Sequence, residues 1–143
     1  MNAAPPLPGE RRKRDADHLN LLAIFHFVGA GLALFGILFL LLHFAIMHAV
    51  FANPKIWADQ KNGPPPAEFF AIFQWLYLFA GVWLFTSLSL NVLSGLFLRA
   101  RKHRTFSFAV AGLNCLHMPL GTVLGVFTII VLNRASVREL YEA

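Results

Sequence analysis

The residues of this chain best suited to chemistry are histidines within long apolar stretches, above all His26, His43 and His117. Imidazole can ligate haem iron, and it can change charge near neutral pH and so gate a pore. His26 and His43 are 17 residues apart, which is about 26 Å along a helix, so they cannot share one metal ion. A haem held by two histidines needs both imidazoles at one depth on neighbouring helices, whereas His26 and His43 fall near opposite membrane boundaries. We therefore expect no metal site and no cofactor, and keep haem b only as an alternative.

Charged side chains are missing from the apolar stretches. Residues 20–52, 69–98 and 105–132 contain no Asp, Glu, Lys or Arg. Intramembrane carboxylates are the usual carriers of protons and cations, so their absence argues against a secondary transporter or pump. It also removes the paired carboxylates of acid–base catalysis, and no Ser-His-Asp pattern or glycine-rich phosphate loop occurs in a suitable setting. We expect the protein not to be an enzyme.

The composition is typical of a membrane protein. The chain has 143 residues, of which 57% are hydrophobic and 13% charged, and its mean hydropathy is +0.61. Soluble domains carry about 25% charged residues, so the polar surface here is too small for a water-soluble globule. The net charge is +5, but no polar segment interleaves basic and aromatic residues as nucleic-acid binding requires. The expected partner is the lipid bilayer, not nucleic acid.

The three apolar stretches predict an all-α integral membrane bundle with transmembrane helices over about 20–52, 69–98 and 105–132. Each stretch exceeds the ~20 residues needed to cross a hydrocarbon core. Residues 1–18 are rich in proline and basic residues and predict a disordered basic tail. The transmembrane domain then covers residues 19–133. A capping-box pattern at Ser136 to Glu139 predicts a short surface helix or tail over residues 134–143.

The third stretch allows an alternative. Pro119 and Gly121 could break it into a re-entrant hairpin of two short arms, which gives two crossings plus a C-terminal hairpin. Irregular backbone facing lipid is not tolerated, so such a hairpin would need burial within an assembly. Proline kinks in ordinary membrane helices are common, and we therefore expect three crossings first.

Each apolar stretch carries a face of small and polar residues at the three-and-four spacing of a helix. Gly121 and Gly125 form a G-x-x-x-G step, whose missing side chains let a second backbone approach closely. Amides and hydroxyls in lipid bond across to neighbouring helices. We expect helix packing at Gly29, Ala33, Gly36, Gly81, Asn91, Gly95, Asn114, Gly121, Gly125 and Thr128.

Basic clusters are expected to mark the cytoplasmic side and to contact lipid headgroups. Three crossings leave four further basic residues, Lys55, Lys61, Arg134 and Arg138, on the outside, whereas the hairpin brings Arg134 and Arg138 inside. Either topology places the N-terminus in the cytoplasm. The headgroup-contacting residues are Arg11, Arg12, Lys13, Arg14, Arg99, Arg101, Lys102 and Arg104.

Two parts of the sequence resemble a known group of proteins. The segment Pro119-Leu-Gly-Thr-Val-Leu-Gly-Val-Phe-Thr-Ile-Ile-Val-Leu132, with Ser136-Val-Arg-Glu-Leu-Tyr141, resembles the ending of small, uncharacterised bacterial multi-pass membrane proteins. The segment Asp17-His-Leu-Asn-Leu-Leu-Ala-Ile-Phe-His-Phe27 is similar to their opening. The resemblance implies a bacterial inner (cytoplasmic) membrane protein of about three helices and implies no activity.

These observations predict a non-enzymatic accessory or scaffolding subunit. Three short helices bury little of each other, and several faces rich in small residues argue for partners. The subunit would pack through these faces into a homo-oligomer or a larger membrane complex. The alternative is a homo-oligomeric ion channel or pore lined by Gln74, Asn91 and Asn114, with His26 as its pH-sensitive gate. A b-haem-binding electron carrier is the third hypothesis.

Overall fold

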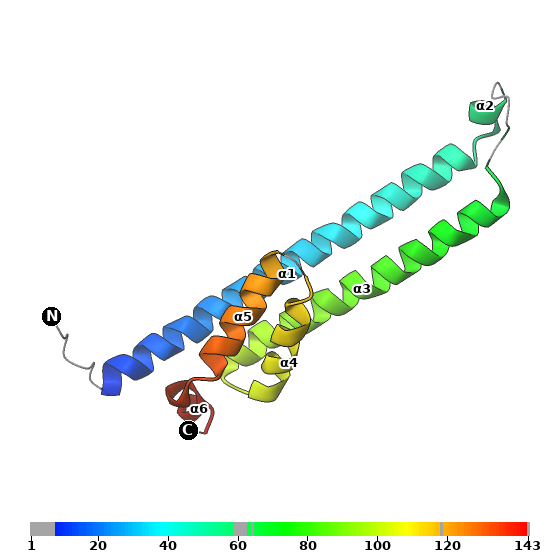
Figure 1. Ribbon diagram of the computed structural model, residues 1–143. Helices are drawn as coiled ribbons and strands as arrows, with labels where there is room; N and C mark the ends of the chain where they lie inside the picture. The colour runs from blue at the N-terminus through cyan, green and yellow to red at the C-terminus, as the bar shows by residue number, and fades with distance from the viewer. Residues whose placement is uncertain (1–7, 59–62, 64, 118, 143) are drawn as a thin grey trace. The chain divides into compact units, whose positions relative to one another are not determined.

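The structure, a computed structural model, describes residues 8–58, 63, 65–117 and 119–142. The described residues form helices and no strand, which confirms the all-α class (Figure 1). Two of the helices, α1 and α3, are long and apolar enough to cross a membrane, as a membrane bundle requires. A third span arises only if α5 and α6, which are bent by 74° at a short break, are counted together. The helices are α1 (Pro8–Phe51), α2 (Pro54–Trp57), α3 (Ala67–Ala100), α4 (Arg104–Asn114), α5 (Leu120–Leu132) and α6 (Ala135–Glu142).

The chain divides into two compact units, and α1 and α3 contribute to both. The first unit comprises residues 1–30 and 89–143, and the second comprises residues 31–88. The core of the first unit gathers apolar side chains from α1, α3, α5 and α6, with Phe27, Leu124, Leu140 and Tyr141 packed against it. This core consists of Leu19, Leu22, Ala23, Leu98, Val131, Leu132 and Val137.

Helix α1 begins at Pro8, so the prediction of a disordered tail is wrong for residues 8–18; residues 1–7 lie outside the described part. Proline suits the first turn of a helix because its missing N–H would have no intrahelical partner there. Glu10, in the same turn, faces the positive end of the helix dipole. Asp15 is buried and pairs with Arg134 at 3.6 Å. This ion pair holds the early turns of α1 against the C-terminal part of the chain.

The predicted helix over residues 105–132 is divided in two, so the expectation of one continuous third helix is wrong. Helix α4 ends at Asn114 and α5 begins at Leu120, because Pro119 cannot donate a backbone hydrogen bond. The Thr122 hydroxyl donates to the Cys115 carbonyl at 2.9 Å and satisfies an acceptor that the break exposes. The arms of 11 and 13 residues are about 16 and 20 Å long, too short to cross a core of about 30 Å. The arrangement is that of the alternative hairpin.

The G-x-x-x-G step lies inside this hairpin. A Cβ atom on Gly121 would lie 2.5 Å from the Asn114 carbonyl oxygen, and one on Gly125 would collide with the Ala111 carbonyl oxygen. The two arms therefore run antiparallel, side by side (Figure 1), at a separation that only glycine permits. At the open end, Arg104 Nε donates to the Leu132 carbonyl at 3.0 Å. The hairpin thus returns the chain to the end where Asp15 pairs with Arg134.

The second unit is a pair of helical segments connected through α2. Gly36 on α1 faces the Leu84 side chain, and Gly81 on α3 faces Leu40. Near the connection, the Phe51 ring stacks on Trp57, with ring centroids 5.7 Å apart. Small residues bring the two helices together here, and aromatic rings fill the space near the connection.

Helix α3 ends in a Schellman motif. The Lys102 N–H donates to the Phe97 carbonyl at 2.9 Å, and the Arg101 N–H donates to the Leu98 carbonyl at 3.3 Å. Arg101 therefore occupies the left-handed position, with φ of 54°, where glycine is usual. A side chain in this conformation costs about 1 kcal/mol.

Candidate functional site: a buried polar core

Four polar side chains from four helices meet inside the first unit. His26 comes from α1, Asn91 from α3, Asn114 from α4 and Thr128 from α5. Their exposed fractions are 0%, 4%, 5% and 0%, respectively. The hairpin and the two long helices therefore enclose a polar centre within an apolar unit.

The two amides form a reciprocal pair. Asn91 Nδ2 donates to Asn114 Oδ1 at 3.2 Å, and Asn114 Nδ2 donates to Asn91 Oδ1 at 2.9 Å. An amide in an apolar interior must find such partners, because leaving it unsatisfied costs about 1–3 kcal/mol. The pair fixes α3 against α4 and sets the position of the hairpin.

The His26 ring faces an oxygen atom on each side. Its Nδ1 atom lies 2.9 Å from Asn91 Oδ1, and its Nε2 atom lies 3.4 Å from Thr128 Oγ1. The Thr128 hydroxyl donates its proton to the Leu124 carbonyl at 2.8 Å, so Oγ1 is left as an acceptor. With the amides in this orientation, Nδ1 donates to Asn91, and Nε2 also faces an acceptor.

The tautomer of His26 depends on the orientation of the two amides. A ring protonated on both nitrogens would donate to Asn91 Oδ1 and to Thr128 Oγ1. If both amides turned over, Asn91 Nδ2 would face Nδ1 and satisfy a neutral ring that donates from Nε2.

The Ser94 and Ser107 hydroxyls are also fully buried and have no hydrogen-bond partner in the described part of the chain. The hydrogen bonds of the cluster join α1, α3, α4 and α5.

The other two candidate histidines lie elsewhere. His43 Nδ1 bonds to the Tyr77 hydroxyl in the second unit, and His117 Nδ1 lies 3.4 Å from the Leu113 carbonyl oxygen at the end of α4. Each of the three candidate imidazoles therefore faces a different protein oxygen. Within the described ranges, no group of three His, Cys, Asp or Glu side chains is placed to hold a metal ion.

The residues predicted to pack helices lie against neighbours within the same chain. Gly29 faces Asn91 and Leu124, and Gly95 faces Phe27 and the backbone of Ala23. Ala33 is buried. The remaining predicted glycines, Gly36, Gly81, Gly121 and Gly125, occupy the contacts described above. The small-residue faces that we expected to be left over for partners are therefore used inside the protein.

Seven of the eight predicted headgroup-contacting residues are exposed: Arg11, Arg12, Lys13, Arg14, Arg99, Arg101 and Lys102. Arg104 differs, because it is half-buried and its Nε caps the end of α5. One long-range contact had no local signal in the sequence: Arg134 Nη1 lies near both Asp15 Oδ1 and His18 Nδ1, at 3.6 and 3.1 Å. Only the return of the hairpin brings these residues together.

Comparison of the chain with protein-family models, with curated proteins and with solved structures gives no match. The resemblance of its two ends to small bacterial membrane proteins therefore stays a prediction.

Proposed function

We propose that this membrane protein is a non-enzymatic accessory or scaffolding subunit of a bacterial inner-membrane assembly, built either from its own copies or with other proteins. The observation that carries the proposal is the apolar length of α1 and α3. The charge-free parts of these helices cover residues 20–51 and 69–98, which is about 48 and 45 Å. A bilayer core is about 30 Å thick.

Lipid alone does not accommodate this length. Fitting 45 Å of helix into 30 Å requires a tilt close to 50°, beyond the usual range of about 0–40°. With less tilt, the ends of the helices carry exposed apolar side chains such as Phe69, Ile72 and Phe73 past the hydrocarbon. With strong tilt, the exposed Gln74 amide enters it. A partner protein that covers the end of the second unit near Phe69 would bury these apolar side chains when the tilt is small and would shield the Gln74 amide from lipid when the tilt is large.

The polar core favours this role over the pore hypothesis. A pore between copies would need Asn91 and Asn114 on the protomer surface, whereas both lie inside the protomer with His26. The docking surface is accordingly the apolar end of the second unit, in place of the small-residue faces.

Purification from native membranes in a mild detergent tests the proposal. We expect the protein mass of the purified particle, without its bound detergent, to be well above the 16.0 kDa of one chain. A particle that holds a single chain would overturn the proposal. Cross-linking locates the surface, using Cys115→Ser as background. Ile72→Cys should form adducts with a neighbouring chain. Phe79→Cys, seven residues further along the same helix face and also exposed, is the matched control and should form few.

A further inference from the structure

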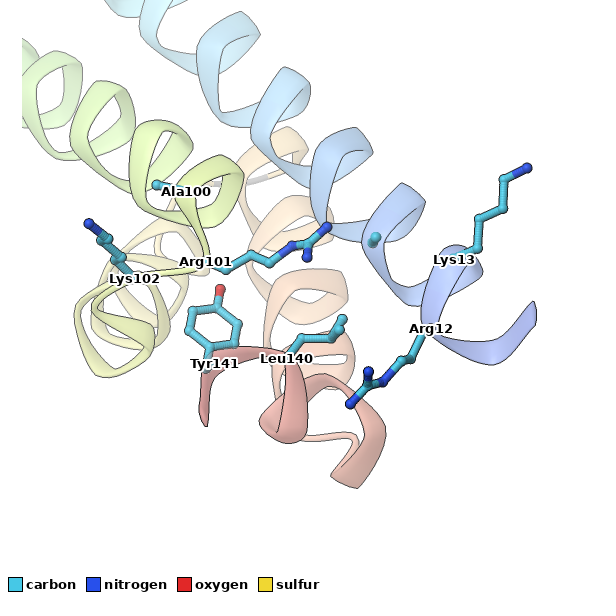
Figure 2. A pocket seen from close by; sticks show the side chains of 8 residues that line it. Arg12, Lys13, Ala100, Arg101, Lys102, Leu140 and Tyr141 are labelled. Carbon is cyan, nitrogen blue, oxygen red and sulfur yellow. The ribbon is translucent and has the colours of Figure 1, made fainter. Parts of the chain in front are cut away.

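A basic pocket lies in the first unit, between the first turns of α1, the end of α3 and α6 (Figure 2). Its volume is about 650 Å³, and four of its eight lining residues are cations, with no carboxylate among them. The lining side chains on which the argument rests are Arg12, Lys13, Arg101, Lys102, Leu140 and Tyr141.

These four cations have no counterion among the residues that the structure describes. None of their side chains makes an ion pair or hydrogen bond with another residue of the described ranges. The buried carboxylate of α1, Asp15, is already engaged by Arg134. Like charges around one cavity repel each other, and the field they create there attracts an anion.

The backbone at Arg101 supports a binding role. This residue holds the left-handed position of the α3 terminus, where glycine would serve without strain. Unfavourable backbone conformations of this kind gather at ligand sites. Both Arg101 and Lys102, which follow the end of α3, line the pocket. Figure 2 shows the Arg101 side chain reaching toward α1 and the Lys102 side chain extending to the opposite side.

The donors indicate the chemistry of the ligand. Guanidinium forks match phosphate oxygens, and lysine supplies a point charge. The Tyr141 hydroxyl is directed toward Arg101 (Figure 2) and has no hydrogen-bond partner in the described part of the chain. We propose that this pocket binds the phosphate of an anionic phospholipid headgroup. A lipid is favoured over free phosphate because the pocket lies where the apolar stretches of α1 and α3 end, which is the depth of headgroups. The inference is independent of any docking partner.

Native mass spectrometry of the purified full chain, titrated with dioctanoyl phosphatidylglycerol or dioctanoyl phosphatidylcholine at fixed ionic strength, tests the assignment. The wild-type protein should bind the anionic lipid about tenfold more tightly. The variant Arg12→Gln/Arg101→Gln should reduce this preference to about twofold or less. The variant Lys55→Gln/Arg138→Gln removes the same charge at exposed positions outside the pocket, and it should keep the preference.

The single variant Arg101→Gly separates binding from folding, because glycine relieves the left-handed strain while it removes the cation. We expect unchanged helical content and a loss of lipid preference of about fivefold. An equal loss of lipid preference in both double variants, or no preference in the wild-type protein, would overturn the assignment of this pocket as the anionic-lipid site. Displacement of the lipid by inorganic phosphate at equal concentration would overturn its assignment to a lipid headgroup.

Discussion

His26 Nδ1 lies 2.9 Å from Asn91 Oδ1, although 65 residues separate the two in the chain. This contact joins α1 to α3, and Asn91 also joins α3 to α4 through its amide pair with Asn114. In lipid, apolar surface gives helices no preference for each other over acyl chains, so polar contacts of this kind decide which helices associate. The hydrogen-bonded cluster is therefore the structural centre of the first unit.

Replacing Asn114 by alanine should weaken the fold, because it leaves the Asn91 amide buried without its reciprocal partner. We expect the free energy of unfolding to fall by about 1–2 kcal/mol, measured by circular dichroism during denaturation in detergent micelles. Gln74→Ala is the control, since this amide is exposed and has no partner in the described ranges; its effect should stay within about 0.5 kcal/mol. Equal effects would show that the buried pair contributes nothing.

Gly125→Leu should disrupt the hairpin of α4 and α5. Any Cβ at this position meets the Ala111 backbone, and relief requires the two helices to move apart. We expect a loss of about 3 kcal/mol in unfolding free energy. Gly112→Leu is the matched substitution, because a Cβ there meets open space, and it should be nearly neutral. Should Gly125→Leu instead lower the mass of the assembly and leave the protomer stable, the G-x-x-x-G step acts between chains.

The hairpin predicts a topology that labelling can check. Single cysteines replace Glu10, Lys55 and Glu139 in a Cys115→Ser background, all three at exposed positions. In spheroplasts, a membrane-impermeant maleimide should label residue 55 and spare both 10 and 139. The reason is that the hairpin returns the chain to the side of the N-terminal basic cluster. Labelling of both residue 55 and residue 139 would contradict the hairpin and would indicate that the third apolar stretch crosses the membrane completely.

The Tyr141 phenol should lose its proton at a higher pH than a free tyrosine does. Burial raises the pKa of Tyr141 to about 12, while the positive charges of Arg104 and Arg101 lower it in part. In a Tyr77→Phe variant, tyrosinate absorbance should therefore rise around pH 12 in the folded protein and around pH 10 in the denatured one. Because the folded state holds the proton more tightly, the stability that this phenol contributes is complete below about pH 10 and is lost as the pH approaches 12. A titration midpoint near pH 10 in the folded protein would contradict the burial of the Tyr141 side chain.

Much of the fold was predictable because helices in a membrane depend on local features. The apolar runs predicted α1 and α3, and the start of α1 was missed because a proline and basic residues suit a first turn as well as a loose tail. Pro119 and Gly121 indicated that the third stretch could break. Whether proline kinks or divides a membrane helix depends on what covers the freed backbone groups, here the Thr122 hydroxyl, and sequence does not show that.

The candidate site was predictable as a set of residues but not as an arrangement. His26, Asn91, Asn114 and Thr128 were each assigned to a pore, a haem or a packing face, and the structure joins all four in one cluster. The ion pair of Asp15 with Arg134 gave no signal at all. Contacts across such separations arise from packing, and no short-range pattern encodes them.

The sequence alone determined the membrane environment, the helical class and the residues that touch other helices, because lipid excludes charge and unpaired backbone groups wherever a chain crosses it. Only the tertiary structure decided that those neighbouring helices belong to the same chain. A glycine face shows that a backbone comes close, but it carries no information about whose backbone that is.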